Sequence, residues 1–255
     1  MGEGSYKENF ARIETKYMVS GDRYEGLMRS LKHLIKPDMY GDTRIYNIYY
    51  DTPDYRLIRR SIEKPVYREK LRLRSYCVPK KDTGCFLEIK KKYEGVVYKR
   101  RIKLAYGDAV ENLEKGEPFH CMEEQAREKG LKFSVDTQIE NEINSMIAYY
   151  KCLQPKMVIS YDRLAFTGVE DSDFRVTFDT NITWRTSDLD LKGGGYGNRL
   201  LEDECRLMEV KCGGSVPLEF AEILSENHIY KTTYSKYGNA YKEYVGRKRN
   251  ACESV

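Results

Sequence analysis

The sequence lacks any long apolar run. None of its segments approaches the roughly 18 consecutive apolar residues that a membrane-spanning helix requires. Its first residues, MGEGSYKENFARIE, hold no apolar core of a signal peptide. We therefore expect no membrane segment and a cytoplasmic location.

Cysteine and histidine motifs are also missing. The seven cysteines form no CxxC pair, and the three histidines form no HExxH motif. Structural zinc sites, dithiol redox centres and zinc proteases depend on such spacings. We expect free thiols, as is usual in a reducing compartment, and no catalytic histidine.

A large overall excess of positive charge is missing as well. The 44 Lys and Arg residues stand against 40 Asp and Glu residues, which leaves a net charge of +4. General nucleic-acid binders carry a larger excess, so nucleic acid is not expected as a partner. The glycine-rich segment KGGGYGNR (192–199) lacks the GK[ST] of a phosphate-binding loop and predicts a mobile hairpin loop instead.

Alternating apolar and polar residues, typical of half-buried strands, are abundant. They occur at 12–19, 44–51, 68–75, 86–92, 96–104, 156–166, 174–182 and 205–212. Longer periodic segments predict helices at 21–36 and 137–153. Shorter helices are predicted at 53–60, 108–114, 121–130, 217–226 and 235–248.

The polar sides of these strands are mostly basic. In YREKLRLRSY (67–76), four cations alternate with leucines. Over all the strands, the polar sides collect Lys16, Lys70, Arg72, Arg74, Lys90, Lys92, Lys99, Arg101, Arg163, Arg175 and Lys211. The acidic exceptions are Glu14, Glu88, Asp179 and Glu209. Neighbouring like charges about 7 Å apart repel by on the order of 2 kcal/mol, so solvent or a bound anion must screen them.

Two architectures fit this pattern. One is an open antiparallel sheet whose basic side meets solvent. The other is an α+β fold in which a closed antiparallel barrel of about eight strands has a basic lumen and is covered outside by helices. The barrel explains better why so many strands share the pattern, and its ligand would be a linear polyanion.

The order of the motifs resembles that of the triphosphate tunnel metalloenzymes, most closely the catalytic domain of the vacuolar transporter chaperone (VTC) family of polyphosphate polymerases. The motifs are RIETKY (12–17), YYDTPD (49–54), KLRLR (70–74), LEIK (87–90), YKRR (98–101), SYDRLAF (160–166), MEVKC (208–212) and YSKYGNA (234–240). Arg12 replaces the first glutamate of the wider ExExK signature, which favours the VTC branch over the triphosphatases. The resemblance covers roughly residues 10–245 and implies that residues 1–255 form a single tunnel domain.

The resemblance implies a role for each matching residue. The catalytic phosphate ligands would be Arg72, Arg74, Lys90, Lys99 and Arg163. Further substrate-binding residues would be Lys16, Lys70, Lys92, Arg101, Tyr161, Lys211, Ser235 and Lys236. Glu209, with Glu14, would bind Mn²⁺ or Mg²⁺. Thr233 stands where the family often has a lysine, so one phosphate contact is missing from the pattern.

The activity that the resemblance implies is transfer of the γ-phosphoryl group of ATP to a growing polyphosphate chain, with ATP and inorganic polyphosphate as partners. One alternative is a metal-dependent triphosphatase of the same fold, with Glu14 or Glu88 as general base. A second alternative is a module that binds polyphosphate or RNA without catalysis. A Glu209→Gln substitution separates an enzyme from a passive module.

Overall fold

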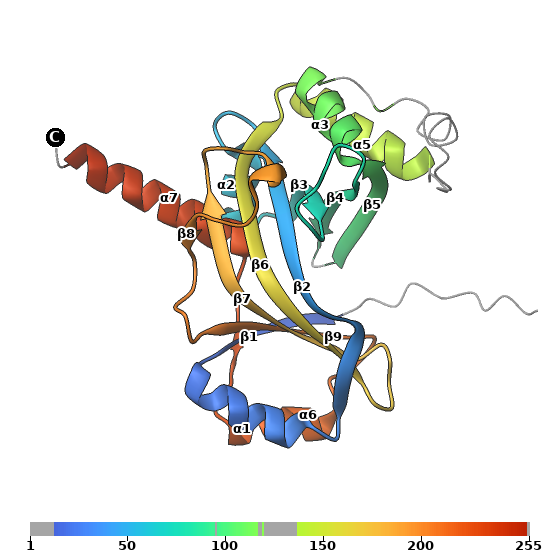
Figure 1. Cartoon of the computed structure of the whole chain (residues 1–255), viewed down its shortest axis with the longest axis vertical. Coiled ribbons are helices and arrows are strands. Elements are labelled where there is room, and N and C mark those ends of the chain that lie inside the picture. The colour runs from blue at the N-terminus through green and yellow to red at the C-terminus, as the bar shows by residue number, and fades with distance from the viewer. Residues whose placement is uncertain (1–12, 95, 117–118, 120–136, 254–255) are drawn as a thin grey trace, which may run out of the picture. The chain divides into compact units, whose positions relative to one another are not determined.

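The computed structural model describes residues 13–94, 96–116, 119 and 137–253. Its strands are β1 (Ile13–Val19), β2 (Ile35–Asp51), β3 (Tyr67–Ser75), β4 (Gly84–Tyr93), β5 (Val96–Ala105), β6 (Gln154–Gly168), β7 (Arg175–Arg185), β8 (Asn198–Arg199), β9 (Arg206–Cys212) and β10 (Lys231–Thr232). Its helices are α1 (Gly21–Leu31), α2 (Arg56–Glu63), α3 (Tyr106–Lys115), α5 (Thr137–Tyr150), α6 (Leu218–Glu226), α7 (Lys236–Glu253) and the 3₁₀ turn η1 (Leu191–Gly193). Every alternating segment forms a strand (Figure 1). The helix predicted at 121–130 and the residue Arg12 lie outside the described residues.

The strands are hydrogen-bonded in the order β10-β1-β9-β7-β6-β2-β3-β4-β5, and β8 pairs with β7. The described pairings, such as β1 with β9 and β3 with β4, are antiparallel. An antiparallel sheet with helices is therefore confirmed. The path has two ends, β10 and β5, and no pairing joins these ends in the part of the chain that the structure describes. A closed barrel is not confirmed.

The chain divides into two compact units, each assembled from three segments. Unit 1 comprises Met1–Thr43, Asp162–Asn181 and Leu201–Tyr234, and unit 2 comprises Arg44–Tyr161, Ile182–Leu200 and Ser235–Val255. The strands β2, β6 and β7 contribute residues to both units. The single domain expected from the sequence stays a prediction.

Unit 1 has its own hydrophobic core, in which α1 and α6 lie side by side (Figure 1). Leu27 and Leu31 of α1, four residues apart, present one apolar stripe and are fully buried. The helix predicted at 21–36 was too long, because α1 ends at Leu31 and β2 begins at Ile35. After Leu31 the chain forms a turn, in which the Leu34 N–H donates to the backbone oxygen of Leu31 at 2.9 Å.

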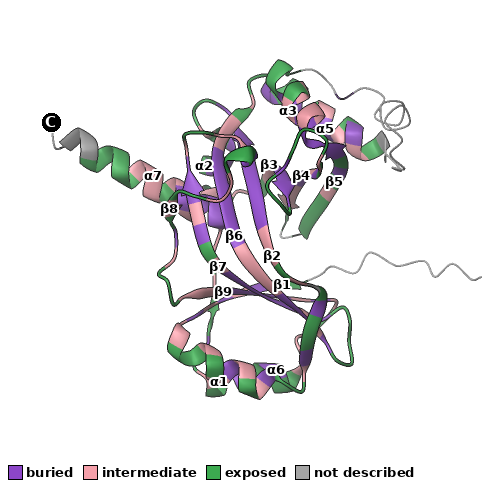
Figure 2. Ribbon diagram, viewed as in Figure 1, coloured by how far each residue is buried: buried purple, intermediate pink, exposed green. Residues whose placement is uncertain are grey.

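Unit 2 buries the leucines of the stretch YREKLRLRSY. Leu71 and Leu73 of β3 are fully buried in one cluster with apolar residues of α2, α3 and α5. Figure 2 shows buried segments on β3 and β4, and Figure 1 shows α3 and α5 next to β5. The prediction that helices cover the apolar side of these strands is therefore confirmed for unit 2. In the described residues, no helix combines the length and apolar character needed to cross a membrane.

The glycine-rich segment of unit 2 connects the hairpin of β7 and β8, as expected. Thr183 pairs with Arg199 at the base of this hairpin. The guanidinium of Arg185 donates to two backbone oxygens of this segment, those of Gly194 and Tyr196, and to those of Asp188 and Asp190 just before it, so the segment is not simply a flexible loop. The buried guanidinium of Arg185 thus fixes the conformation of the loop backbone.

Candidate functional site

The strands β3, β4 and β5 of unit 2 place their cations in register on one side. The backbone pairing aligns two rows across the three strands, Lys70–Lys90–Lys99 and Arg72–Glu88–Arg101. Together with Arg74 and Lys92, these residues form what we call the basic face. Seven of its eight side chains are cations, so the repulsion between neighbours favours the binding of an anion.

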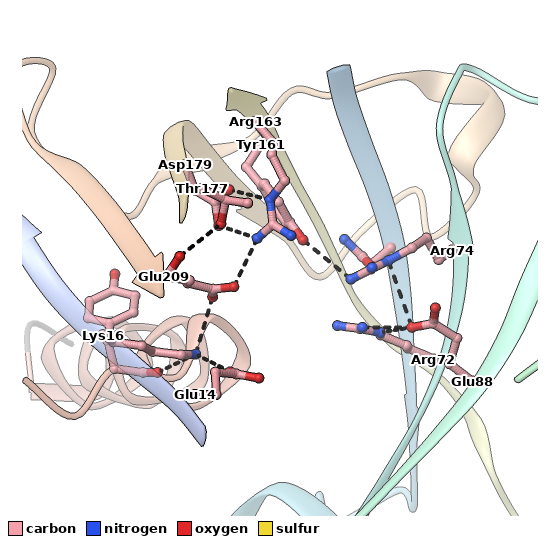
Figure 3. A network of polar contacts seen from close by, with 12 residues as sticks. Glu14, Lys16, Arg72, Arg74, Glu88, Tyr161, Arg163, Thr177, Asp179 and Glu209 are labelled. Atoms are coloured by element: carbon pink, nitrogen blue, oxygen red, sulfur yellow. Dashed lines mark hydrogen bonds and ion pairs between the residues drawn. The ribbon is translucent and has the colours of Figure 1, made fainter. Parts of the chain in front are cut away.

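Arg72 is anchored by two neighbouring side chains. Its Nε and Nη2 lie 2.7 and 2.6 Å from Glu88 Oε2, and its Nη1 donates to the hydroxyl of Tyr49 at 3.3 Å. Burial lowers the pKa of Arg72, but Tyr49 and Glu88 outweigh burial and raise this pKa above its usual value. The guanidinium therefore stays charged and fixed in orientation (Figure 3).

Glu88 is the one carboxylate of the basic face, and the neighbouring arginines shift the pKa of its carboxyl. Burial raises the pKa of the Glu88 carboxyl, but the charges of Arg72 and Arg74 outweigh burial and lower it below its usual value. Arg74 Nε lies 3.8 Å from Glu88 Oε2. Glu88 is consequently an anionic spacer between two arginines and a weak base.

Arg74 is buried and held by neutral partners. Its Nε donates to Asn47 Oδ1 at 3.0 Å, and its Nη2 donates to the Tyr161 hydroxyl at 3.3 Å. The Asn47 amide in turn donates to the backbone oxygen of Ile159 at 3.1 Å, so the asparagine orientation is fixed. The two hydrogen-bond partners of Arg74 are uncharged, and the nearest carboxylate, that of Glu88, lies 3.8 Å from its Nε and also contacts Arg72.

The start of α7 brings two more predicted ligands to unit 2's basic residues. Lys70 Nζ donates to Ser235 Oγ at 3.2 Å, and the backbone N–H of Gly238 donates to the same oxygen at 3.1 Å. The ammonium of Lys236 lies 4.5 Å from the ring centre of Tyr161. Lys70, Tyr161, Ser235 and Lys236, all predicted to bind substrate, therefore form one connected group with Arg74.

The outer positions of the basic face are more open. Lys99 and Arg101 on β5 are exposed, whereas Lys90 and Lys92 on β4 are half-buried. The Arg101 guanidinium lies over the ring of Phe86, 4.6 Å from its centre. The structure thus places these four predicted residues on the same side of the sheet as Arg72, with Lys99 and Arg101 nearest to solvent.

A second charged group lies in unit 1 and contains the predicted metal ligands. Lys16 Nζ lies 3.5 Å from Glu14 Oε1 and 3.2 Å from Glu209 Oε1, and it donates to the backbone oxygen of Tyr234 at 3.1 Å. The two glutamates come from β1 and β9, whose register pairs Lys16 with Glu209. The lysine therefore bridges the two carboxylates expected to bind a metal (Figure 3).

Arg163 connects Glu209 to a third carboxylate. Its Nε and Nη2 donate to the two oxygens of Asp179 at 2.6 and 2.7 Å, and Nη2 also lies 3.0 Å from Glu209 Oε2. Asp179 is fully buried. We call Glu14, Lys16, Arg163, Asp179 and Glu209 the acidic cluster. In this arrangement the arginine predicted to bind phosphate orients Glu209.

Lys211 lies beside the acidic cluster in register. Its Cα is paired with Glu14 on β1 and with Arg175 on β7. Thr233, the residue that replaces an expected lysine, is exposed. Among the described residues, no group of three or more His, Cys, Asp and Glu side chains has a geometry suited to a metal.

Three residues that contact predicted ligands were not predicted themselves. Asn47 and Tyr49 orient the two arginines of β3, and Asp179 holds Arg163. A signal existed for the first two, because Asn47 and Tyr49 alternate along β2 and pair in register with Arg74 and Arg72. Asp179 stands out in the sequence only as an acidic residue on a mostly basic side of a strand, which does not indicate its partner.

A comparison with models of protein families identifies the family of the chain. The pattern of the VTC domain matches residues 11–245, and the chain therefore belongs to the VTC domain family. No curated protein matches the chain. Family membership and the basic face together support a polyphosphate-related enzyme of the phosphotransfer kind, with polyphosphate or a nucleotide as substrate.

Two solved structures resemble the chain with low sequence identity. A candidate adenylate cyclase of Vibrio parahaemolyticus has a TM-score of 0.48 and 12% identity, over 92% of this chain and 99% of that one. A second candidate adenylate cyclase, from Bacillus halodurans, has a TM-score of 0.48 and 15% identity, over 88% of this chain and 95% of that one. At these TM-scores, neither likeness supports a conclusion about the activity of this chain.

Proposed function

We propose that the protein is a polyphosphate polymerase that transfers the γ-phosphoryl group of ATP to the end of a polyphosphate chain. The observation that carries this proposal is the basic face, where seven cations and one carboxylate lie on one side of three paired strands. Phosphoryl transfer needs positioning and charge neutralisation more than a protein nucleophile. A row of cations along a sheet suits a substrate that repeats its charge along a chain.

The individual side chains of the basic face have distinct roles in this proposal. Arg72 and Arg74, whose planar forks are fixed by neighbours, would bind phosphate oxygens with defined geometry. Lys70, Lys90 and Lys99 would neutralise successive phosphates along their row. We include in the proposal that the basic face lines a closed tunnel, which would exclude water from the reacting phosphate.

The acidic cluster would hold the divalent cation that the family implies. Mg²⁺ is usually bound by one or two carboxylates and by oxygens of the substrate phosphates, and Glu14 and Glu209 fit that requirement. Their oxygens already share one cation, the ammonium of Lys16. A bound Mn²⁺ or Mg²⁺ would neutralise phosphate charge, while Arg163 keeps Glu209 in orientation.

The proposal is tested with the purified protein, ATP, Mn²⁺ and a short polyphosphate primer. We expect a product that lengthens with time and is digested by an exopolyphosphatase. An Arg72→Ala variant serves as the negative control, since it lacks the cation anchored by Glu88 and Tyr49. Absence of such a product with primer and metal both present would overturn the proposal.

The triphosphatase alternative has less support from the geometry. It needs a general base, and Glu88 is a poor one because Arg72 and Arg74 lower the pKa of its carboxyl. Glu14 is bridged to Glu209 by Lys16. Release of orthophosphate from tripolyphosphate without chain growth would select this alternative over the polymerase.

A further inference from the structure

The start of α7 contains a buried tyrosine that no proposed step uses. Tyr237 directly follows the predicted ligands Ser235 and Lys236, and 2% of its surface is exposed. Its hydroxyl donates to Asp51 Oδ2 at 3.0 Å, and its ring stacks on Tyr49 with ring centres 4.3 Å apart and planes 19° apart. Tyr237 therefore has one polar and one aromatic anchor, both within unit 2.

The polar anchor is itself rigid. Asp51 is fully buried at the end of β2, and its carboxylate accepts hydrogen bonds from the backbone N–H groups of Thr52, Leu57 and Ile58 at 2.8, 2.8 and 3.0 Å. Leu57 and Ile58 lie in the first turn of α2, where an anion is favoured. The Asp51 carboxylate is thus fixed by three backbone donors in addition to its hydrogen bond from Tyr237.

The aromatic anchor leads directly to the basic face. Tyr49 stacks on Tyr237 and accepts the hydrogen bond from Arg72 Nη1 at 3.3 Å. A continuous series of contacts therefore runs from Asp51 through Tyr237 and Tyr49 to Arg72. The series joins the helix that carries Ser235 and Lys236 to the strand that carries the arginines.

The hydroxyl of Ser235 depends on the fixed position of the start of α7. Ser235 Oγ accepts from Lys70 Nζ and from the Gly238 N–H, which uses both of its lone pairs. Its own proton is then oriented as a donor away from these two groups. Such a donor suits a phosphate oxygen only if α7 begins in a defined place.

We propose that Tyr237 is a positioning residue, anchored by Asp51 and Tyr49, that holds Ser235 and Lys236 against the basic face for phosphate binding. Tyr237 does not touch the phosphate. The inference rests on the proposed function only in taking an oligophosphate as the anion. Its effect is expected on binding, because a small displacement of fixed donors is enough to lose affinity.

The test measures binding of inorganic tripolyphosphate to the full chain by calorimetry, without metal or turnover. Tyr237→Phe removes the hydroxyl and keeps the ring that stacks on Tyr49. We expect about tenfold weaker binding. Tyr106→Phe is the matched control, because Tyr106 is another buried tyrosine of unit 2 whose hydroxyl donates to a carboxylate, Asp190 Oδ1, at 2.8 Å. We expect Tyr106→Phe to leave the affinity unchanged.

A double-mutant cycle separates positioning from a general loss of packing. Ser235→Ala should weaken tripolyphosphate binding in the wild-type background and have little further effect in the Tyr237→Phe background, because the serine is already misplaced there. Tyr49→Leu, which removes the ring that stacks on Tyr237, provides a second variant should Tyr237→Phe fold poorly, and Tyr49→Phe, which keeps that ring and removes only the contact with Arg72, is its control. We expect Tyr49→Leu to weaken binding more than Tyr49→Phe.

The outcomes distinguish this inference from the proposed activity. Equal affinity of Tyr237→Phe and wild type, an equal loss in Tyr106→Phe, or strict additivity with Ser235→Ala would overturn the inference. A wild-type protein that binds no tripolyphosphate would overturn it too. Tyr237-dependent binding in a protein that makes no polyphosphate would instead keep the inference and contradict the polymerase proposal.

Discussion

The two units of the chain organise their charges in opposite ways. The acidic cluster of unit 1 has three carboxylates and two cations; Glu14 and Asp179 each contact one of these cations, and Glu209 contacts both. The basic face of unit 2 has one carboxylate among eight residues, and its register sets lysine beside lysine. The first arrangement is nearly neutral by itself, whereas the second is completed by an anion.

This difference determines how much positive charge an arginine of each unit can offer to a ligand. In unit 1, Arg163 gives Nε and Nη2 to the fully buried Asp179 and to Glu209, so much of its donor capacity is structural. In unit 2, Arg74 donates to the uncharged Asn47 and Tyr161, and its carboxylate neighbour Glu88 is farther away, at 3.8 Å. Arg74 therefore offers a ligand a less compensated charge than Arg163, although the sequence predicts the same role for both.

The largest expected effect breaks the acidic cluster. Glu209→Gln removes the carboxylate shared by Lys16 and Arg163 and should lower metal-dependent chain growth by at least about 100-fold. Tripolyphosphate binding without metal should stay equal or become tighter, because one negative charge is lost. Steady-state synthesis and calorimetry check the two expectations. Glu219→Gln, an exposed glutamate of the same unit, is the control, and equal losses in both variants would contradict the metal role of Glu209.

The next effect tests whether fork geometry matters on the basic face. Arg72→Lys keeps the charge but loses the fork that contacts Glu88 and Tyr49, so we expect tripolyphosphate affinity to fall about 10- to 100-fold. Arg100→Lys is matched to it, since Arg100 lies on β5 and pairs with Glu142 instead. Unchanged affinity in Arg72→Lys would show that charge alone suffices.

A smaller effect concerns the ammonium that bridges the predicted metal ligands. Lys16→Met removes the cation between Glu14 and Glu209, and we expect about tenfold tighter Mn²⁺ binding in the absence of substrate, as the two carboxylates lose their counterion. Electron paramagnetic resonance of free Mn²⁺ measures this affinity directly. Weaker Mn²⁺ binding in Lys16→Met would place the metal elsewhere in the protein. Lys32→Met, an exposed lysine of the same unit, serves as the control.

The strands and most of the basic face could be predicted from the sequence because their signal is local. Alternation with period two fixes which side of a strand each residue occupies, and the register then places Lys70, Lys90 and Lys99 in one row. The end of α1 was predicted at residue 36 instead of Leu31, because Leu34 continues the apolar spacing of the helix although it lies in the turn before β2. Periodicity alone does not separate a helical residue from a residue of the turn that follows.

The contacts that orient the site could not be predicted in the same way. The hydrogen bond between Tyr237 and Asp51 joins residues 186 positions apart, and although both lie in motifs of the resemblance, nothing in the sequence indicates that they pair. Closure of a barrel is likewise a property of distant pairings, which alternation within each strand does not specify. Sequence patterns identified the charges, while the geometry that orients them depends on tertiary contacts.

The smallest effect sharpens the role of the one carboxylate on the basic face. Burial raises the pKa of the Glu88 carboxyl, but Arg72 and Arg74 outweigh it, so the folded value lies below the usual 4.5. The ionised Glu88 carboxylate therefore stabilises the folded state fully above pH 4.5. This stabilisation is lost as the pH falls through the pKa that the carboxyl has in the folded protein. Glu88→Gln should lower the free energy of unfolding by about 1 kcal/mol at pH 7 and by less under strongly acidic conditions. Urea unfolding at both pH values measures this difference, and an equal loss at both would show that Glu88 contributes by packing rather than by charge.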